Sequence, residues 1–494
     1  MSRRLEELRP LQPGRVTIYT CGPTVYDRAH IGNFRTFLWE DLLRRYLRWK
    51  GYQVTQVMNL TDVDDRTINA ALESGADLAA TTGPVIEAFA EDWGTLGLEE
   101  PEYRPRATEH VDGMVSLVER LTERGLAYER DGSVYFAISR QAGYGQLAGI
   151  DLSAGPAPAG AQRAFEAAAD EEYDKEDARD FVLWKGGARG EQAAGAVWDS
   201  PWGPGRPGWH LECSAMAMEY LGDTLDIHAG GVDNLFPHHT NEIAQSEGAT
   251  GKIFARMWLH AAHLQVEGEK MSKSLGNCYT IPDLLDRGLR PSSLRYLLLS
   301  GHYRTRLNFT FAGVEAAAKS VDRIHQLRRR VCEALDAATG KDESPPGASS
   351  ALEEAVARAR RDFETAMDDD LNVSQALAAV FGVVREANQA LTAAGSGDSR
   401  AAELRATLAF LDDFDRVWGV LALRDSEGTE TDGDLEAWAV ARAEARLKAR
   451  ADRDWATADA IREELQTRGI AVEDSPGGTR MLIGSNTVTV AAGD

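Results

Sequence analysis

The chain has 494 residues, which is more than one hydrophobic core usually organises, so we expect several domains. Its 43% hydrophobic and 27% charged residues are typical of a globular protein, and no apolar run approaches the roughly 20 residues of a membrane-spanning helix. The net charge of −24 argues against a protein coated in nucleic acid. The first ten residues lack the apolar stretch of a signal peptide, so we expect a cytoplasmic protein that does not contact membranes.

Local basic patches can still bind RNA phosphates, whatever the total charge. Arg44, Arg45 and Arg48 form one candidate patch, and the three arginines at 328–330 form another. The alternative interpretation is that both are ordinary solvated helix faces.

The first predicted elements form a strand–helix–strand unit. Residues 15–20 are predicted to be a strand, and a loop that contains glycine and proline follows. From Phe34 to Lys50 apolar side chains recur at three- and four-residue steps, as on one face of a helix. Gly51 ends this helix, and residues 52–60 are predicted to be the next strand. This order predicts a βαβ unit and a parallel sheet.

The α/β pattern is then interrupted and resumes later. Residues 125–139 predict a hairpin with an Asp-Gly turn, and residues 152–170, rich in Ala, Gly and Pro, predict a loose loop. Near Trp209 a helix, a strand and a second helix from Pro237 restore the pattern. We therefore expect one α/β domain that contains an insertion.

The remainder of the chain is predicted to be helical from about Thr310, with a linker at 341–350, breaks at 393–400 and 424–434, and short strands from Ile470. The predicted fold class is α/β: a Rossmann-like parallel-sheet domain with an insertion, followed by a C-terminal α-helical bundle and a small α+β end. The expected domains are 1–105 and 201–310 for the two halves of the α/β domain, 106–200 for the insertion, 311–425 for the bundle and 426–494 for the small terminal domain.

The first chemical signal is a histidine and a glutamate. His238 and Glu242 are four residues apart after Pro237, so they share one face of a helix. Such a pair alone is more often a surface hydrogen bond than a metal site. The four cysteines, Cys21, Cys213, Cys278 and Cys332, include no CxxC pair, and buried thiols are their default interpretation.

Two of these cysteines strengthen the metal interpretation. Cys21 follows the first strand and Cys213 lies near a helix start before the returning strand, and loops that follow parallel strands gather at one edge of the sheet. Two thiolates, an imidazole and a carboxylate suit zinc better than magnesium or calcium. His228 and His239 are alternative ligands, or groups that orient the ligands from behind.

Two loops carry signals for a nucleotide. In DRAHIGN, residues 27–33, Gly32 permits a nucleotide close to the backbone, the helix start attracts phosphate, and His30 is a candidate donor to a phosphate oxygen. The alternative is that this histidine is only a capping detail. In GEKMSKSLGN, residues 268–277, Lys270 and Lys273 are suited to neutralise charge on a transferring phosphate, although such a stretch is otherwise an ordinary surface loop.

HIGN and KMSKS, with an interrupted α/β domain between them, resemble the HIGH and KMSKS signatures of class I aminoacyl-tRNA synthetases. His30 and Gly32 match the first signature, Asn33 replaces its last histidine, and KMSKS matches at all five positions. The segments TCGPTVYDRAHIGN, NLTDVDDR, PGWHLECSAM and DIHAGGVDNLFPHHTNEIAQSE narrow the resemblance to the cysteinyl-tRNA synthetases. The resemblance covers nearly the whole chain and is weakest at 152–176 and 187–198.

The resemblance implies one zinc ion per chain, bound by Cys21, Cys213, His238 and Glu242, the four residues that the spacing also suggested. It implies that L-cysteine binds this zinc through its thiolate in a pocket lined by Thr61, Trp209 and His228. The implied catalytic groups are His30, Lys270 and Lys273. The implied contacts to ATP, which carries Mg²⁺, are His30, Gly32, Asn33, Asp233, Lys270 and Lys273.

The implied reaction makes cysteinyl-adenylate from cysteine and ATP and transfers the cysteinyl group to a cysteine tRNA. Shape alone separates cysteine from serine poorly, by about 1–3 kcal/mol, whereas zinc prefers a soft thiolate. The resemblance further implies a monomer whose anticodon contacts are Arg450, Trp455, Asp459 and Asp474. An aromatic side chain of this kind suits an unstacked base; the alternative is that Trp455 packs a helical hairpin.

Two other functions are compatible with parts of this pattern. A cysteine ligase with a small-molecule acceptor, resembling the mycothiol-pathway ligases, shares the catalytic domain and the zinc but lacks a long anticodon-reading end. A non-enzymatic RNA-binding or regulatory paralogue is expected to lose KMSKS or a zinc ligand, and this chain loses neither.

Overall fold

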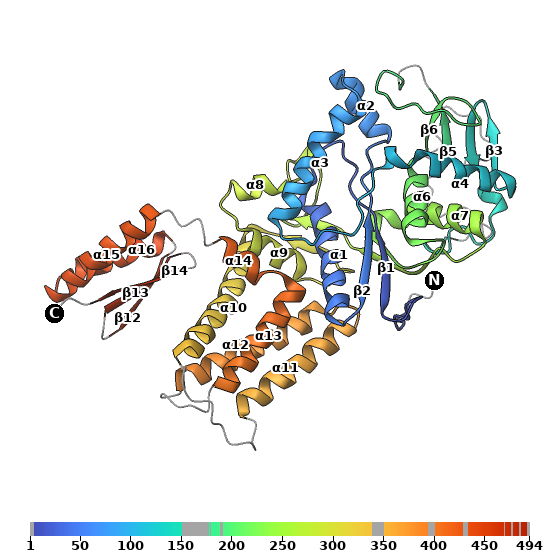
Figure 1. Ribbon diagram of the computed structural model, residues 1–494. Coiled ribbons are helices and arrows are strands. Elements are labelled where there is room, and N and C mark those ends of the chain that lie inside the picture. Colours follow the sequence, from blue (N-terminus) through green and yellow to red (C-terminus); the bar gives the residue numbers. More distant parts are fainter. Residues whose placement is uncertain are drawn as a thin grey trace.

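The computed structural model describes residues 4–150, 177, 179–187, 191–337, 350–393, 401–427, 433–468, 470–475, 478–483 and 486–491 (Figure 1). The loop predicted at 152–170, the stretch of weak resemblance at 152–176 and all of the predicted linker except Ser350 lie outside these residues. No described helix has the length and apolar character that a bilayer crossing requires.

Four parallel strands form the sheet that carries the site, in the order β2-β1-β7-β8. Their bounds are β1 Arg15–Thr20, β2 Gln53–Met58, β7 Leu225–Gly231 and β8 Ala255–Ala261. Along the chain, β2 is added on one side of β1 and β7 on the other, so the strand order reverses between β1 and β7. Ligands of open α/β sheets bind beyond the carboxyl ends of the strands at such a point.

Both faces of this sheet are buried. Val16 and Ile18 pack into a core with α1 (Ile31–Trp49), whereas Tyr19 packs into a second core with α6 (Trp209–Leu221) and α7 (His238–Thr250). This division follows from the alternation of side chains along a strand. Figure 1 shows α1 on one side of the strands and α6 and α7 on the other. The predicted α/β class with a parallel sheet is confirmed.

The helix predicted over 34–50 is α1, which begins at Ile31. It starts earlier than predicted because His30 and Asn33 form a capping box, in which each side chain accepts a hydrogen bond from the other residue's backbone N–H. It ends as predicted, since Gly51 follows with φ +90°.

Between β2 and α6, the described residues form the helices α2 Asp65–Ser74, α3 Leu78–Thr95 and α4 Val111–Glu123 and an antiparallel sheet in the order β3-β4-β5-β6. The strands are β3 Ala127–Arg130, β4 Ser133–Phe136, β5 Phe181–Gly186 and β6 Gly205–Pro207. β3 and β4 are the predicted hairpin, and Asp131 and Gly132 both have positive φ, as a type I′ turn requires. Because β6 pairs with β5, this sheet continues past residue 200.

After β8 the chain forms a small sheet that carries the basic loop. Its strands are β9 Leu264–Val266, β10 Glu269–Lys270 and β11 Leu307–Phe309, and the loop between β10 and α8 (Ile281–Leu285) contains one 3-10 turn, Lys273–Leu275. The helix α9, Pro291–Leu299, then packs against α1.

The predicted bundle consists of α10 Phe311–Ala337, α11 Ala351–Asp368, α12 Val373–Ala393, α13 Ala401–Trp418 and α14 Leu421–Glu427. It shares one hydrophobic core with α1. Residues 424–427 belong to α14, so the break predicted at 424–434 is shorter than expected; most of the break predicted at 393–400 lies outside the described residues.

The terminal part pairs α15 (Gly433–Ala451) and α16 (Trp455–Thr467) with the sheet β12-β13-β14, whose strands are Ala471–Ser475, Gly478–Ile483 and Asn486–Ala491. It has a small core of its own and lies beside the bundle in Figure 1. An ion pair of 3.0 Å between Arg480 and Glu333 joins it to α10. The predicted helical region with a small α+β end is confirmed.

Candidate active site

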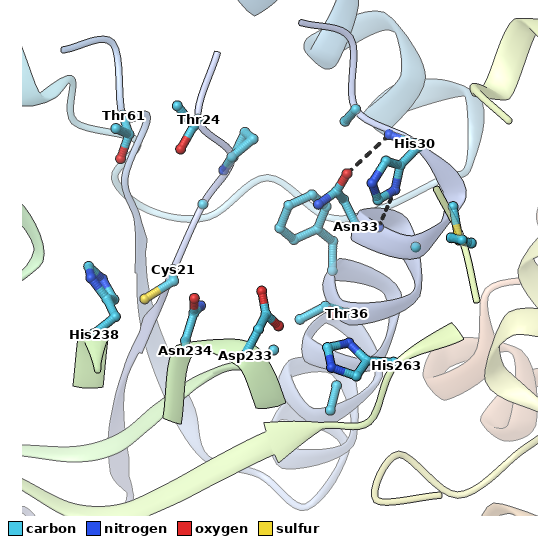
Figure 2. Close-up of a pocket in the computed structure, with 18 of the residues that line it drawn as sticks. Cys21, Thr24, His30, Asn33, Thr36, Thr61, Asp233, Asn234, His238 and His263 are labelled. Atoms are coloured by element: carbon cyan, nitrogen blue, oxygen red, sulfur yellow. Dashed lines mark hydrogen bonds between the residues drawn. The ribbon is translucent and has the colours of Figure 1, made fainter. Parts of the chain in front are cut away.

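A cleft of about 880 Å³ opens at the carboxyl ends of β1 and β7. Its lining includes Cys21 and Thr61 at one end and His30 at the start of α1, and it reaches Lys270 and Lys273 of the basic loop. Figure 2 shows Cys21, Thr61 and His238 on one side of this space and His30 and Asn33 on the other. The cleft therefore lies where the reversal of strand order predicts a ligand site.

Four potential metal ligands converge at one end of the cleft. Cys21 follows β1, Cys213 lies on α6, and His238 and Glu242 lie one turn apart on α7. Their ligand atoms all lie within 4.8 Å of one another. The distances are 4.0 Å between the two Sγ atoms, 4.0 Å from Cys21 Sγ to Glu242 Oε1 and 3.1 Å from His238 Nε2 to Glu242 Oε1. Tetrahedral zinc needs ligand atoms roughly 3.3–3.8 Å apart, so only small side-chain shifts are required.

The ligand atoms of a second group, Cys21, His228, His239 and Glu242, also lie within 4.8 Å of one another. His228 and His239 are both fully buried and do not line the cleft, whereas Cys21, Cys213 and His238 do. A metal ion that also takes a substrate atom needs a coordination position that faces the cleft. The first group satisfies that requirement better.

The other histidines hold these ligands from behind. His228 Nε2 lies 2.7 Å from Glu242 Oε2, and His239 Nε2 lies 3.2 Å from Cys21 Sγ. His210 Nδ1 lies 2.9 Å from His238 Nδ1, which leaves the Nε2 of His238 directed at Glu242. His228 was expected in the lining of the amino-acid pocket, but β7 places it behind Glu242, where it orients a ligand.

The electrostatics of the four ligands fit a bound cation. Burial raises the pKa of the Cys21 and Cys213 thiols and of the Glu242 carboxyl, and burial lowers the pKa of the His238 imidazole. The neutral form of every ligand is therefore favoured, and a divalent cation among them reverses this preference for the thiols and the carboxyl. Two sulfur atoms with one nitrogen and one oxygen are a ligand set that zinc accepts.

The expected amino-acid pocket adjoins these ligands. Thr61 lines the cleft, and its hydroxyl donates to Glu212 Oε2 over 2.9 Å. The Trp209 indole is 40% exposed and stacks on the His238 ring with their centroids 4.5 Å apart. Thr61 and Trp209 thus lie where a molecule held beside Cys21 and His238 would contact them.

The expected nucleotide end begins at the start of α1. His30 Nδ1 accepts a hydrogen bond of 3.3 Å from the Asn33 N–H, so the proton of the neutral ring resides on Nε2. Burial lowers the pKa of His30, which favours that neutral form. His30 thus caps α1, and the cap leaves an N–H donor at the opposite end of the ring. The substitution of Asn for the last histidine of the signature supplies the other half of the capping box.

Gly32 brings the two signature loops into contact. A Cβ atom at this position would lie 3.0 Å from the His30 ring and 3.1 Å from Met271 Sδ. The space that a side chain would need is therefore occupied by the His30 ring and by Met271 of the basic loop. In that loop, Lys273 is 64% exposed, forms an ion pair with Asp27 and lies over the Tyr26 ring at 5.3 Å.

The remaining expected nucleotide contacts also face the cleft. Asp233 lies on a 3-10 turn after β7 and Lys270 ends β10, and both line the cleft. Figure 2 shows Asp233 between the Cys21 end and His263. A side chain on Gly231 would lie 2.4 Å from Asp233 Oδ1, so the glycine before this turn leaves room for the carboxylate.

Comparison with known proteins agrees with this geometry. Residues 7–319 match the model of the tRNA synthetases class I (C) catalytic domain. The chain is 47% identical to a cysteine–tRNA ligase of Solibacter usitatus, covering 97% of both chains, and 44% identical to one of Protochlamydia amoebophila, covering 97% of this chain and 96% of that one. The chain belongs to the cysteine–tRNA ligase family.

Two further family models match the C-terminal parts: a DALR domain at residues 362–422 and a cysteinyl-tRNA ligase anticodon binding domain at 435–480. Solved structures share the fold. A methionyl-tRNA synthetase of Mycobacterium tuberculosis in complex with methionyl-adenylate has a TM-score of 0.61 at 17% identity, covering 83% of this chain and 91% of that one. The anticodon-domain match extends the similarity to cysteinyl-tRNA ligases to residues 435–480, and the solved structure supports the fold alone.

The four residues expected to contact the anticodon lie in the matched terminal domain. Trp455 is 59% exposed at the start of α16, so it does not pack the helical hairpin, and that alternative is wrong. Asp474 on β12 forms ion pairs with Arg446 at 2.7 Å and with Arg450 at 2.6 Å, which lower its pKa. Asp459 lies on α16. Two of the four expected contacts are thus already paired with each other.

The two candidate basic patches are largely neutralised. Arg44 is buried and bonded to Glu102 at 2.7 Å, and Arg48 pairs with Glu99 at 2.6 Å. In the second patch Arg328 pairs with Asp412 and Asp425. Because carboxylates already hold the guanidinium groups of Arg44, Arg48 and Arg328, these arginines do not fit a phosphate-binding surface.

Sequence reasoning missed three residues of the site. Asn59 and Glu212 flank Thr61 in a buried hydrogen-bond chain, and Asp27 holds Lys273. Asn59 lies two residues before Thr61, a spacing that puts two side chains on the same face of an extended strand. Glu212 immediately precedes the ligand Cys213, and its unusual position in an apolar helix segment was the only available signal.

Proposed function

We propose that this chain activates L-cysteine with Mg-ATP and transfers the cysteinyl group to the 3′ end of a cysteine tRNA. The observation that supports this best is that the four proposed metal ligands and both signature loops meet at one cleft. The chain that carries them belongs to the cysteine–tRNA ligase family. We further propose that the protein works as a monomer in the cytoplasm, where its three substrates occur.

Cys21, Cys213, His238 and Glu242 would hold one zinc ion per chain. When bound there, zinc supplies a soft cation that attracts the thiolate of cysteine more strongly than the hydroxyl of serine. Trp209 forms one wall beside His238, and His228 keeps the Glu242 carboxylate in place. Thr61 lines the pocket for the remainder of the amino acid.

In the first step the cysteine carboxylate oxygen attacks the α-phosphorus of ATP, and the bond to the leaving pyrophosphate breaks. The His30 Nε2–H, Lys270 and Lys273 donate to phosphate oxygens as negative charge shifts to the leaving group. Asp27 raises the pKa of Lys273, so its ammonium group is positively charged at neutral pH. Gly32, Asn33 and Asp233 complete the proposed ATP site.

In the second step a terminal ribose hydroxyl of the tRNA attacks the carbonyl carbon of the adenylate, and AMP leaves. We assign the domain roles accordingly: residues 1–105 and 201–310 catalyse, 106–200 together with β6 form an insertion, 311–425 connect, and 426–494 recognise the anticodon. Arg450, Trp455, Asp459 and Asp474 are the proposed anticodon contacts, with Asp474 acting by holding Arg450.

Pyrophosphate exchange tests the selection of cysteine. The wild type should exchange with cysteine and not with serine, and removal of zinc by a chelator should abolish exchange until zinc is restored. Cys213→Ala should lose zinc and exchange together, whereas Cys332→Ala, on α10, should keep both. Equal exchange with serine by the wild type would refute zinc selection.

Two further measurements separate the roles of the loop and the acceptor. Lys273→Ala should slow adenylate formation far more than it weakens cysteine binding, and equal losses would indicate misfolding.

Charging of a cysteine tRNA transcript, compared with transfer to an amino-sugar acceptor, distinguishes the synthetase from the small-molecule ligase. Transfer to the amino sugar without tRNA charging would refute the proposed acceptor.

A further inference from the structure

A chain of buried hydrogen bonds runs beside the proposed zinc ligands. The Gly22 N–H donates to Asn59 Oδ1, Asn59 Nδ2 donates to Thr61 Oγ1, and Thr61 Oγ1 donates to Glu212 Oε2, each over 2.9 Å. Asn59, Thr61 and Glu212 are 1%, 3% and 0% exposed. The chain ends at a carboxyl group, and among the described residues Glu212 Oε1 has no hydrogen-bond partner.

The direction of this chain is determined at its first member. A backbone N–H can only donate, so the Gly22 N–H requires the oxygen of the Asn59 amide to face it. The backbones approach closely here, since a Cβ on Gly22 would lie 1.7 Å from the Asn59 carbonyl oxygen. The NH₂ group of Asn59 therefore faces Thr61, and the Thr61 hydroxyl directs its hydrogen at Glu212 Oε2.

This direction decides what Thr61 offers to a ligand. A hydroxyl has one hydrogen to donate and two positions at which it accepts. Glu212 takes the hydrogen and Asn59 fills one accepting position, so only one accepting position is left toward the cleft that Thr61 lines (Figure 2). Thr61 can accept a hydrogen bond from a ligand in the cleft but cannot donate one.

Only one group of cysteine matches an acceptor at this place. The thiolate and the carboxylate accept hydrogen bonds, and the α-ammonium group is the single donor. Asn59 also lies next to a proposed zinc ligand, because its Oδ1 is 3.6 Å from Cys213 Sγ. The acceptor thus has a fixed position relative to the place where a thiolate would bind.

We propose that Asn59 and Glu212 are positioning residues that make Thr61 an acceptor for the α-ammonium group of the substrate. This proposal rests on the proposed function, in which cysteine occupies this cleft with its sulfur at the Cys21 end. Its consequence is a second selection, for an α-amino acid over a thiol acid that lacks the amine. Without Glu212 the Thr61 hydroxyl can rotate and donate to the substrate carboxylate, and this selection weakens.

The test compares the Kd of L-cysteine with that of 3-mercaptopropionate, which has the thiol and the carboxylate but no ammonium group. Both are measured on the full-length zinc-loaded protein by competition in pyrophosphate exchange. Glu212→Met should reduce the preference for cysteine about tenfold, the size expected when a hydrogen bond to a charged group is lost. Binding of 3-mercaptopropionate should change little.

A double-mutant cycle checks that Glu212 acts through Thr61. Thr61→Val should reduce the preference at least as much as Glu212→Met, and the double variant should lose no more than Thr61→Val alone. Independent, additive losses would overturn the proposal. So would a Glu212→Met variant that binds both compounds equally more weakly, since that pattern indicates a general loss of structure.

Asp226 provides the matched control. It is buried and accepts a hydrogen bond of 3.0 Å from the Thr17 hydroxyl, at the opposite ends of the same strands β1 and β7. Asp226→Leu should lower stability without changing the preference for cysteine. A wild type that fails to discriminate cysteine from serine refutes the proposed function, whereas an unchanged preference in an active Glu212→Met variant refutes only the positioning role.

Discussion

The arginine that joins α1 to the bundle allows a quantitative prediction. Arg295 on α9 is fully buried, and its guanidinium group donates to the carbonyl oxygens of Leu96, Gly97 and Trp418 at 3.1, 3.2 and 2.5 Å. It also forms an ion pair with Asp41 on α1. Arg295 therefore connects α1, the loop after α3 and the end of α13.

Replacing Arg295 by Met leaves a buried carboxylate and three carbonyl groups short of a donor. Breaking a buried pair in this way costs about 3–5 kcal/mol of unfolding free energy. The lower part of that range is expected, because Asp41 keeps hydrogen bonds from Arg45 at 2.7 Å and from the Glu99 N–H at 2.9 Å. Arg290→Met, which breaks a partly exposed pair with Asp322, should cost about 1 kcal/mol or less.

Urea unfolding between pH 3 and pH 7 measures both losses. The Arg295 and Arg45 guanidinium groups, together with the Glu99 N–H, lower the pKa of Asp41 against the effect of burial. Its contribution is therefore fully present above the unfolded pKa of about 3.9 and is lost as the pH falls through the folded pKa. The penalty of Arg295→Met should be largest at neutral pH and shrink below about pH 4. A penalty under about 1 kcal/mol at pH 7, or one that grows in acid, would refute this reasoning.

Two further substitutions should separate stability from function. Gly32→Ala should change the free energy of unfolding by less than about 1 kcal/mol, since Ala is a better helix former. It should nevertheless raise the KM for ATP in pyrophosphate exchange, because its Cβ displaces the His30 ring and Met271. An unchanged KM would contradict the proposed contact between the loops. Trp455→Ala should raise the KM for tRNA about tenfold, the loss expected for one stacked base. Pyrophosphate exchange and thermal unfolding should be unaffected. A parallel loss of exchange would assign Trp455 a structural role instead.

The sequence by itself determined the local elements and the identities of the reacting groups. Alternation and three- to four-residue spacing are properties of neighbouring residues, so β1, α1 and the β3–β4 hairpin could be predicted within a few residues. The resemblance and the spacing together also named the four proposed zinc ligands, because each lies at a strand end or on one helix face.

Only the tertiary structure decided which groups face the cleft and which act from behind. In the sequence His238 is the candidate ligand and His228 an alternative to it. The distinction depends on how β7 and α7 pack, because this packing places His228 behind Glu242 and leaves His238 at the cleft. The neutralisation of Arg44 by Glu102 and the direction of the chain from Gly22 to Glu212 depend likewise on contacts between distant residues. Hydrogen-bond direction follows from three-dimensional neighbours, and residue spacing carries no information about it.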